Sequence, residues 1–209
     1  DLKRIFDGDK GPNTGGMGTY APAPVLTDAL RDEAMKIILK PMVEAMEKEG
    51  MPYVGCLYAG LMITDEGPKV VEFNARFGDP ETQVVLPLLD SDLGEIMMAC
   101  ATGTLTSNMV KWKDSSAACV ILASKGYPET SSKGDVISGN IKQYDTTIVF
   151  HSGTKLVGEN YVTNGGRVLG VVGLGKDLRT ALDRAYGRIE HIDFEGMQYR
   201  TDIGAKAFK

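Results

Sequence analysis

The first half of the chain carries apolar residues at helical spacing. That spacing predicts a helix over 28–49, with Thr27 as its N-cap and Gly50 at its end. Pro41 lies inside this helix and is expected to kink it, because proline lacks the N–H that the helical ladder needs. The residues on the apolar stripe are Leu30, Ala34, Ile37, Ile38 and Ala45.

A β-hairpin and a second helix follow. The residues of 54–63 and 69–74 are rich in β-formers, and the turn-forming residues of 65–68 separate them. Pro80 is expected to open a short helical stretch. Asp92 with Glu95 resembles a capping box, which predicts a helix that ends at Gly103. Its apolar face comprises Leu93, Ile96, Met97 and Cys100.

From residue 115 onward the pattern changes to short β-prone runs. Asn164 and Gly165 stand between two of these runs and predict a hairpin turn. Asp177 is expected to cap a final helix. The composition therefore predicts an α+β fold with a boundary near 111–114, dividing the chain into domains 1–112 and 113–209. The β-prone runs are 117–123, 135–138, 147–151, 161–163 and 167–172.

Composition narrows the class of protein. The 209 residues are 43% hydrophobic, which is enough for a packed core. A formal charge of -5, with acidic and basic residues interspersed, argues against nucleic acid as a partner. No apolar run predicts a membrane span, and no signal peptide is recognised, so we expect a cytoplasmic protein. Because the chain opens on Asp1 within a dense loop, we expect it to be a segment of something longer, with terminal processing as the competing explanation.

The sequence around Glu72 carries the clearest chemical signal. On a strand, Glu72 and Asn74 project to the same face, whereas Val71 and Phe73 point to the other. A carboxylate and an amide oxygen are hard ligands of the kind that Mg²⁺ prefers, with water and substrate phosphates completing its shell. Alternatively, Glu72 lies on a solvated face and Asn74 begins a turn. Arg76 and Asp79 follow directly, and they either bind substrate or pair with each other to stiffen the loop.

A glycine-rich segment at 11–18 reads GPNTGGMG. Its backbone N–H groups could cradle a phosphate, although it fits neither a P-loop nor a dinucleotide fingerprint, and composition alone predicts only a turn. No Ser-His-Asp or Cys-His pattern stands out, so a protein nucleophile is not expected.

The run RFGDPETQ at 76–83 resembles the signature of the phosphoribosylamine–glycine ligases, a family of the ATP-grasp superfamily. Four further segments are similar to that family: 11–18, LYAGLM at 57–62, HSGTK at 151–155 and VTNGGRV at 162–168. The resemblance runs from end to end. It implies the C-terminal part of an ATP-grasp domain, followed by a small β-rich domain with a packed helix.

The resemblance also implies a reaction and a set of site residues. ATP and Mg²⁺, with Mn²⁺ as a possible substitute, would drive ligation of glycine to 5-phosphoribosylamine in purine biosynthesis. Glu72 and Asn74 would bind the metal that bridges the nucleotide phosphates, and Arg76 and Asp79 would serve catalysis. The strand at 55–62 has no acidic residue, which puts a second metal in doubt. The substrate-binding residues implied are Asn13, Gly15, Gly16, Arg76 and Arg167.

The same resemblance implies that an N-terminal half, with the lid and adenine-binding residues, is missing from this chain. The isolated segment would then be inactive. Two alternatives remain: another ATP-grasp ligase that joins a different carboxylate and amine, or a non-catalytic module without the nucleotide lid.

Overall fold

The computed structural model describes residues 1–208, which form two compact units. Unit 1 comprises 1–22, 79–88 and 113–209, and unit 2 comprises 23–78 and 89–112. Two segments that precede the predicted boundary at 112/113 thus belong to the same unit as the C-terminal part, and the division into domains 1–112 and 113–209 stays a prediction. The fold is α+β, as the sequence predicts.

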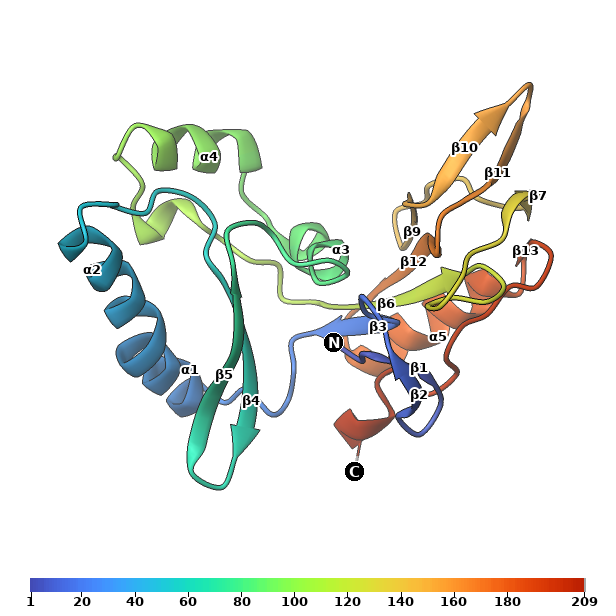
Figure 1. Ribbon diagram of the computed structural model, residues 1–209. Helices are drawn as coiled ribbons and strands as arrows, with labels where there is room; N and C mark the ends of the chain where they lie inside the picture. Colours follow the sequence, from blue (N-terminus) through green and yellow to red (C-terminus); the bar gives the residue numbers. More distant parts are fainter. Residues whose placement is uncertain (209) are drawn as a thin grey trace. The chain divides into compact units, whose positions relative to one another are not determined.

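Unit 1 is built on a four-stranded antiparallel sheet in the order β3-β6-β12-β9 (Figure 1). Every residue of β6 is buried, because helices cover both faces of the sheet. Ala118, Val120 and Leu122 pack in the cluster that contains α5, whereas Ala117, Cys119 and Ile121 pack with Val84 of α3 and Leu88 of η2. The elements concerned are β3 (Gly18–Ala21), β6 (Ser116–Ala123), β9 (Thr147–His151), β12 (Arg167–Gly175), α3 (Thr82–Val85), η2 (Leu86–Leu88) and α5 (Leu178–Ile189).

The helix α5 packs directly against the sheet. Asp177 caps it by accepting a hydrogen bond from the N–H of Thr180 at 2.8 Å, which confirms the predicted cap. Ala181 and Ala185 are fully buried against Gly173 of β12. A Cβ atom at Gly173 would lie 2.0 Å from the carbonyl oxygen of Ala181, so only glycine fits between strand and helix.

The predicted hairpin at Asn164–Gly165 is wrong. The strands on either side, β11 and β12, belong to different sheets, since β11 pairs with β10 and β7. Gly153 separates them: its N–H donates to the Arg167 carbonyl at 2.8 Å, and its own carbonyl accepts from Asn164 N–H at 2.7 Å. The remaining strands of this unit are β7 (Lys133–Val136), β8 (Ser138–Gly139), β10 (Thr154–Val157), β11 (Asn160–Asn164) and β13 (Ile192–Asp193).

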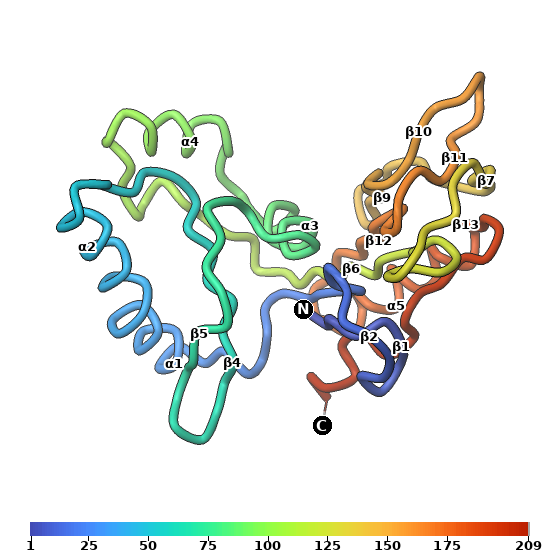
Figure 2. Tube along the Cα trace, viewed as in Figure 1, coloured from blue at the N-terminus to red at the C-terminus, as the bar shows by residue number. Residues whose placement is uncertain are grey.

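The N-terminal hairpin of β1 (Arg4–Phe6) and β2 (Lys10–Asn13) lies beside the last segment of the chain, as Figure 2 shows. Arg200, whose side chain is fully buried, joins the two. Its Nε and Nη2 donate to both carboxylate oxygens of Asp202 at 2.7 Å, and its Nη1 donates to Asp9 at 2.9 Å. The segment ends in the short helix η4 (Ala205–Phe208), from which Lys206 also contacts Asp9. We call Arg200, Asp9 and Asp202 the Arg200 clasp.

The Arg200 clasp makes stability depend on pH. The hydrogen bond from Arg200 holds the pKa of Asp202 well below its usual range, and those from Lys206 and Arg200 lower the pKa of Asp9. Since both folded-state pKa values are depressed, the stabilisation is present above about pH 4, where unfolded aspartates ionise, and is lost as the pH falls through the folded values.

We therefore expect Asp202→Asn to lower the free energy of unfolding by about 2 kcal/mol at pH 7, because Arg200 loses a charged partner. The difference from the unchanged protein should shrink below about pH 4. Urea unfolding at a series of pH values measures both effects. Asp183→Asn, an exposed change on α5, is the matched control. A difference that stays constant from pH 7 to pH 2 would contradict the role of the clasp.

Unit 2 contains the long predicted helix in three pieces, α1, η1 and α2. Thr27 caps α1 by accepting from Leu30 N–H at 3.3 Å, as predicted. The change of helical register falls in η1, a π-helical stretch whose last bond runs from Lys40 N–H to the Met35 carbonyl. Pro41 follows at the start of α2 and has no N–H to continue the α-helical ladder, which explains the predicted distortion. The bounds are α1 (Asp28–Ala34), η1 (Met35–Leu39) and α2 (Lys40–Lys48).

The same unit holds the predicted β4–β5 hairpin and the helix α4, which Asp92 caps through Glu95 N–H at 3.0 Å. On the apolar stripe of the long helix, Ile37 is half exposed and Ala45 is also exposed. In residues 1–208, every residue of the three buried apolar clusters belongs to unit 1. The bounds are β4 (Tyr58–Thr64), β5 (Gly67–Asn74), α4 (Leu93–Ala101) and η3 (Ser107–Met109).

None of the helices described in residues 1–208 is both long enough and apolar enough to cross a membrane.

Candidate functional site

In unit 2, the end of β5 presents Glu72 and Asn74. The two residues stand two positions apart on the strand, opposite Gly60 and Tyr58 of β4. A Cβ at Gly60 would lie 3.1 Å from Cγ of Glu72, so the glycine leaves room for the glutamate side chain across the ladder. Glu72 is exposed and Asn74 half-buried. The register thus agrees with a shared ligand face, while metal binding by these residues stays a prediction.

Arg76 follows β5 and is exposed. Its Nη1 donates to the carbonyl oxygen of Phe77 at 2.9 Å, which folds the side chain along its own backbone. That contact leaves the other guanidinium N–H groups to be satisfied elsewhere, and a guanidinium at the surface suits a carboxylate or phosphate. Substrate binding by Arg76 stays a prediction.

In unit 1, the glycine-rich loop 14–16 has its N–H groups engaged within the protein. Gly15 N–H donates to the Tyr127 hydroxyl and Gly16 N–H to the Thr14 hydroxyl, each at 2.9 Å. Thr14 and Met17 N–H groups donate to backbone carbonyls at 2.8 Å. The backbone N–H groups at 14–17 are therefore already paired within unit 1, and a phosphate cradle in this loop stays a prediction. Substrate contact by Asn13, Gly15 or Gly16 through other atoms stays a prediction.

Asp79 forms an ion pair with Arg167, which lies 88 residues further along the chain. Arg167 Nη2 donates to Asp79 Oδ2 at 2.8 Å, and Nη1 donates to the backbone carbonyls of Asp79 and Gly15, both at 3.0 Å. The Arg167 side chain is 18% exposed and that of Asp79 45%. The sequence analysis gave an ion pair between Arg76 and Asp79 as the alternative to substrate binding. Asp79 does form an ion pair with an arginine, but that arginine is Arg167. The structure joins three predicted site residues: Gly15, Asp79 and Arg167.

Sequence reasoning gave no role to two residues of this network. Gln83 donates from Nε2 to Asp79 Oδ1 at 2.8 Å, and its own buried Oε1 has no hydrogen-bond partner among residues 1–208. Tyr127 receives the Gly15 N–H. Gln83 lies within the family signature, which was a usable signal, whereas nothing local marks Tyr127.

The oxygen donors on β5 fit Mg²⁺ only as a partial site. Among residues 1–208, no group of three or more His, Cys, Asp or Glu side chains is arranged to hold a metal. A carboxylate and an amide on one strand face suit an ion that completes its shell with water and phosphate oxygens. The residues present therefore fit Mg²⁺ bound together with a phosphorylated ligand.

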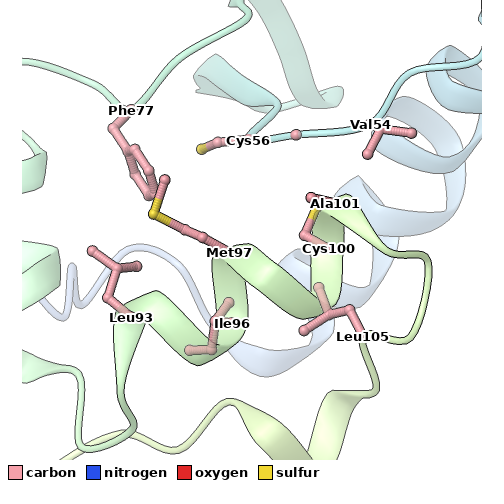
Figure 3. A pocket seen from close by; sticks show the side chains of 10 residues that line it. Val54, Cys56, Phe77, Leu93, Ile96, Met97, Cys100, Ala101 and Leu105 are labelled. Carbon is pink, nitrogen blue, oxygen red and sulfur yellow. The ribbon is translucent and has the colours of Figure 1, made fainter.

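A separate apolar pocket of about 270 Å³ lies within unit 2. Figure 3 shows Ile96, Met97 and Cys100 of α4 on one side of it, with Phe77 and Cys56 on the other. Burial, with a smaller effect of nearby Cys100, raises the pKa of the Cys56 thiol, so it stays protonated at neutral pH. The pocket offers apolar surface and the neutral Cys56 thiol rather than the charged groups that polar substrates require.

Known proteins resemble this chain over its whole length. The family descriptions "Phosphoribosylglycinamide synthetase, ATP-grasp (A) domain" and "Phosphoribosylglycinamide synthetase, C domain" match residues 1–82 and 117–206. A phosphoribosylamine–glycine ligase of Caulobacter vibrioides is 52% identical over 212 residues, covering 100% of this chain and 50% of that protein.

Two solved structures are also similar to this chain. A phosphoribosylamine–glycine ligase of Thermotoga maritima superimposes with a TM-score of 0.86 at 36% identity, covering 97% of this chain and 50% of that one. The biotin carboxylase domain of Hydrogenobacter thermophilus 2-oxoglutarate carboxylase, solved with MgADP, has a TM-score of 0.62 at 14% identity, covers 88% of this chain and 40% of that one, and shares the fold alone. This chain spans about half the length of the relatives it matches, and it belongs to the phosphoribosylglycinamide synthetase family.

Proposed function

We propose that this chain is the C-terminal half of a phosphoribosylamine–glycine ligase of purine biosynthesis. ATP transfers its terminal phosphoryl group to the glycine carboxylate, giving glycyl phosphate and ADP. The amine of 5-phosphoribosylamine then attacks the carbonyl carbon, releasing phosphate and forming glycinamide ribonucleotide. The observation that carries the proposal is the pair Glu72 and Asn74 on one face of β5, in a chain of this family.

Glu72 and Asn74 would hold Mg²⁺, or Mn²⁺, with the phosphates of ATP. A bound divalent ion neutralises charge that develops on the transferred phosphoryl group. The contribution of the chain itself is a carboxylate and an amide held on a strand, where Gly60 leaves room for the glutamate side chain.

The other site residues would bind and orient the two remaining substrates. Arg76 has a surface guanidinium suited to a carboxylate or phosphate, and with Asp79 it would act in catalysis. Both Arg167 amino groups donate to Gly15 or Asp79, so we assign Arg167 to ordering these residues in addition to substrate contact. Asn13, Gly15 and Gly16 would contact substrate. Such an enzyme would work in the cytoplasm, where purine precursors are made.

The N-terminal half of the same enzyme would supply the nucleotide lid and the adenine contacts. We therefore expect the 209-residue chain to form no glycinamide ribonucleotide and to bind Mg-ATP weakly. Two protein ligands hold Mg²⁺ poorly without a closed site, and water that stays in the site weakens charge stabilisation. Calorimetric titration with Mg-ATP and a product assay with glycine, alanine and serine measure these properties.

Adding the N-terminal half in trans should restore ligation of glycine but not of the other amino acids.

Hydrogen exchange of the 209-residue chain should differ between the two units. Because the large apolar side chains of Ile37, Val71 and Met97 in unit 2 are at least half exposed, the amides of unit 2 should exchange faster than those of unit 1. Tight ATP binding or ligation by the chain alone would contradict the division into halves. A parent protein that never ligates glycine would refute the proposed function.

A further inference from the structure

Two side chains hold the peptide groups of Gly15 from opposite ends. The Gly15 N–H donates to the Tyr127 hydroxyl at 2.9 Å, and the Gly15 carbonyl accepts from Arg167 Nη1 at 3.0 Å. Both partners lie more than 100 residues further along the chain, Tyr127 after β6 and Arg167 at the start of β12. The loop is thus held by the main sheet of unit 1.

The position of the Tyr127 ring is itself determined by close packing. A Cβ at Gly166 would lie 2.2 Å from Cδ2 of the ring, so the ring occupies the space where a side chain at Gly166 would begin. Gly166 is anchored in turn, because its carbonyl accepts from the Ser124 N–H at 2.8 Å. A hydrogen bond from the Tyr127 N–H to the Ser124 carbonyl, at 3.2 Å, completes this turn.

Gly16, which follows Gly15, has an unusual backbone conformation that the surrounding contacts must hold in place. Gly16 has a φ of +118°, a conformation that side chains rarely allow, and a Cβ there would lie 2.5 Å from Cδ of Pro80. Pro80 follows Asp79, whose carboxylate is bound by Arg167. A shift of the peptide between Gly15 and Gly16 would therefore disturb Asp79 as well.

We propose that Tyr127 is a positioning residue that holds the Gly15–Gly16 peptide, and through it Asp79, in the arrangement that receives the non-nucleotide substrates. The inference rests on the proposed function, in which Gly15, Gly16 and Asp79 serve glycine and the phosphoribosyl amine. Tyr127 itself touches no reacting atom; it acts through the loop.

Tyr127→Phe tests the proposal, since it removes the hydroxyl and keeps the ring against Gly166. In the 209-residue chain labelled with ¹⁵N-glycine, hydrogen exchange of the Gly15 amide should accelerate about tenfold. In the protein completed by its N-terminal half, the KM for glycine or for the phosphoribosyl amine should rise about tenfold. A less ordered loop loses more conformational entropy when the substrate binds, and this loss weakens binding. The KM for ATP and kcat should stay nearly unchanged.

Two further variants separate positioning from general stability. Gly166→Ala should push the ring away and reproduce the same change in KM. Tyr186→Phe is the matched control: its hydroxyl donates to the Arg200 carbonyl at 2.9 Å and accepts from Ile203 N–H at 3.0 Å. It should lower the melting temperature without changing any KM.

Unchanged Gly15 exchange in Tyr127→Phe would overturn the proposal. So would a loss of activity that follows the melting temperature while all KM values stay constant. Absence of glycine ligation in the unsubstituted protein would instead refute the proposed function, and Gly15 exchange would then decide by itself whether Tyr127 holds the loop.

Discussion

Glu72→Gln in the protein completed by its N-terminal half should lower turnover at least about 10²-fold, the loss typical of removing one preorganised electrostatic group. The substitution keeps the length and shape of the side chain and its space beside Gly60. What it removes is the negative charge that would bind the divalent ion together with the Asn74 amide. Steady-state turnover at saturating Mg²⁺ and ATP measures the effect.

Glu66→Gln is the matched control for this experiment. Glu66 lies in the turn of the same hairpin, where it forms an exposed ion pair with Lys69 at 3.0 Å, and such surface pairs contribute little. Its turnover should stay within about twofold of the unchanged enzyme. A Glu72→Gln enzyme with near-normal turnover would refute the metal-binding role of Glu72, whatever the control shows.

Gly173→Ala should lower the free energy of unfolding of unit 1 by about 3 kcal/mol, at the upper end of the cost of overpacking a core. The added methyl group would lie 2.0 Å from the Ala181 carbonyl oxygen and 2.6 Å from the Ala185 nitrogen. These atoms belong to the backbone of α5, so no side-chain rotation relieves the clash and the helix must move away from β12. Urea unfolding, followed by the amide exchange of α5, measures the loss.

Gly187→Ala gives the opposite expectation on the same helix. Gly187 is exposed on α5, and a Cβ there would meet no atom of the described residues within 4 Å. Alanine should therefore stabilise the protein by about 0.5–1 kcal/mol, because it restricts the unfolded chain and favours the helix. If both substitutions changed stability equally, close packing between β12 and α5 would not be the reason for glycine at 173.

Signals that act over a few residues were enough to predict several elements. Thr27, Asp92 and Asp177 cap their helices as expected, since each accepts a hydrogen bond from an N–H three residues later. The β4–β5 hairpin follows from two adjacent runs of β-forming residues, and the alternation that places Glu72 with Asn74 lies within the eight residues of β5. Family resemblance added the metal-binding role that we predict for Glu72 and Asn74, which geometry alone does not supply.

Other features depended on residues far apart in the sequence. Asp79 pairs with Arg167, which is 88 residues away, and the Gly15 N–H finds its acceptor 112 residues away at Tyr127. The turn at Asn164 has the sequence of a hairpin, but the backbone of Gly153 enters between the two strands and directs them into different sheets.

Local sequence sets which conformations a segment prefers, and it therefore determined the caps, the β4–β5 hairpin and the face of β5 that Glu72 shares with Asn74. The partner of a buried polar group is chosen by which distant segments pack together. For that reason only the tertiary structure assigned Arg167 to Asp79, Tyr127 to Gly15 and the two covered faces to β6.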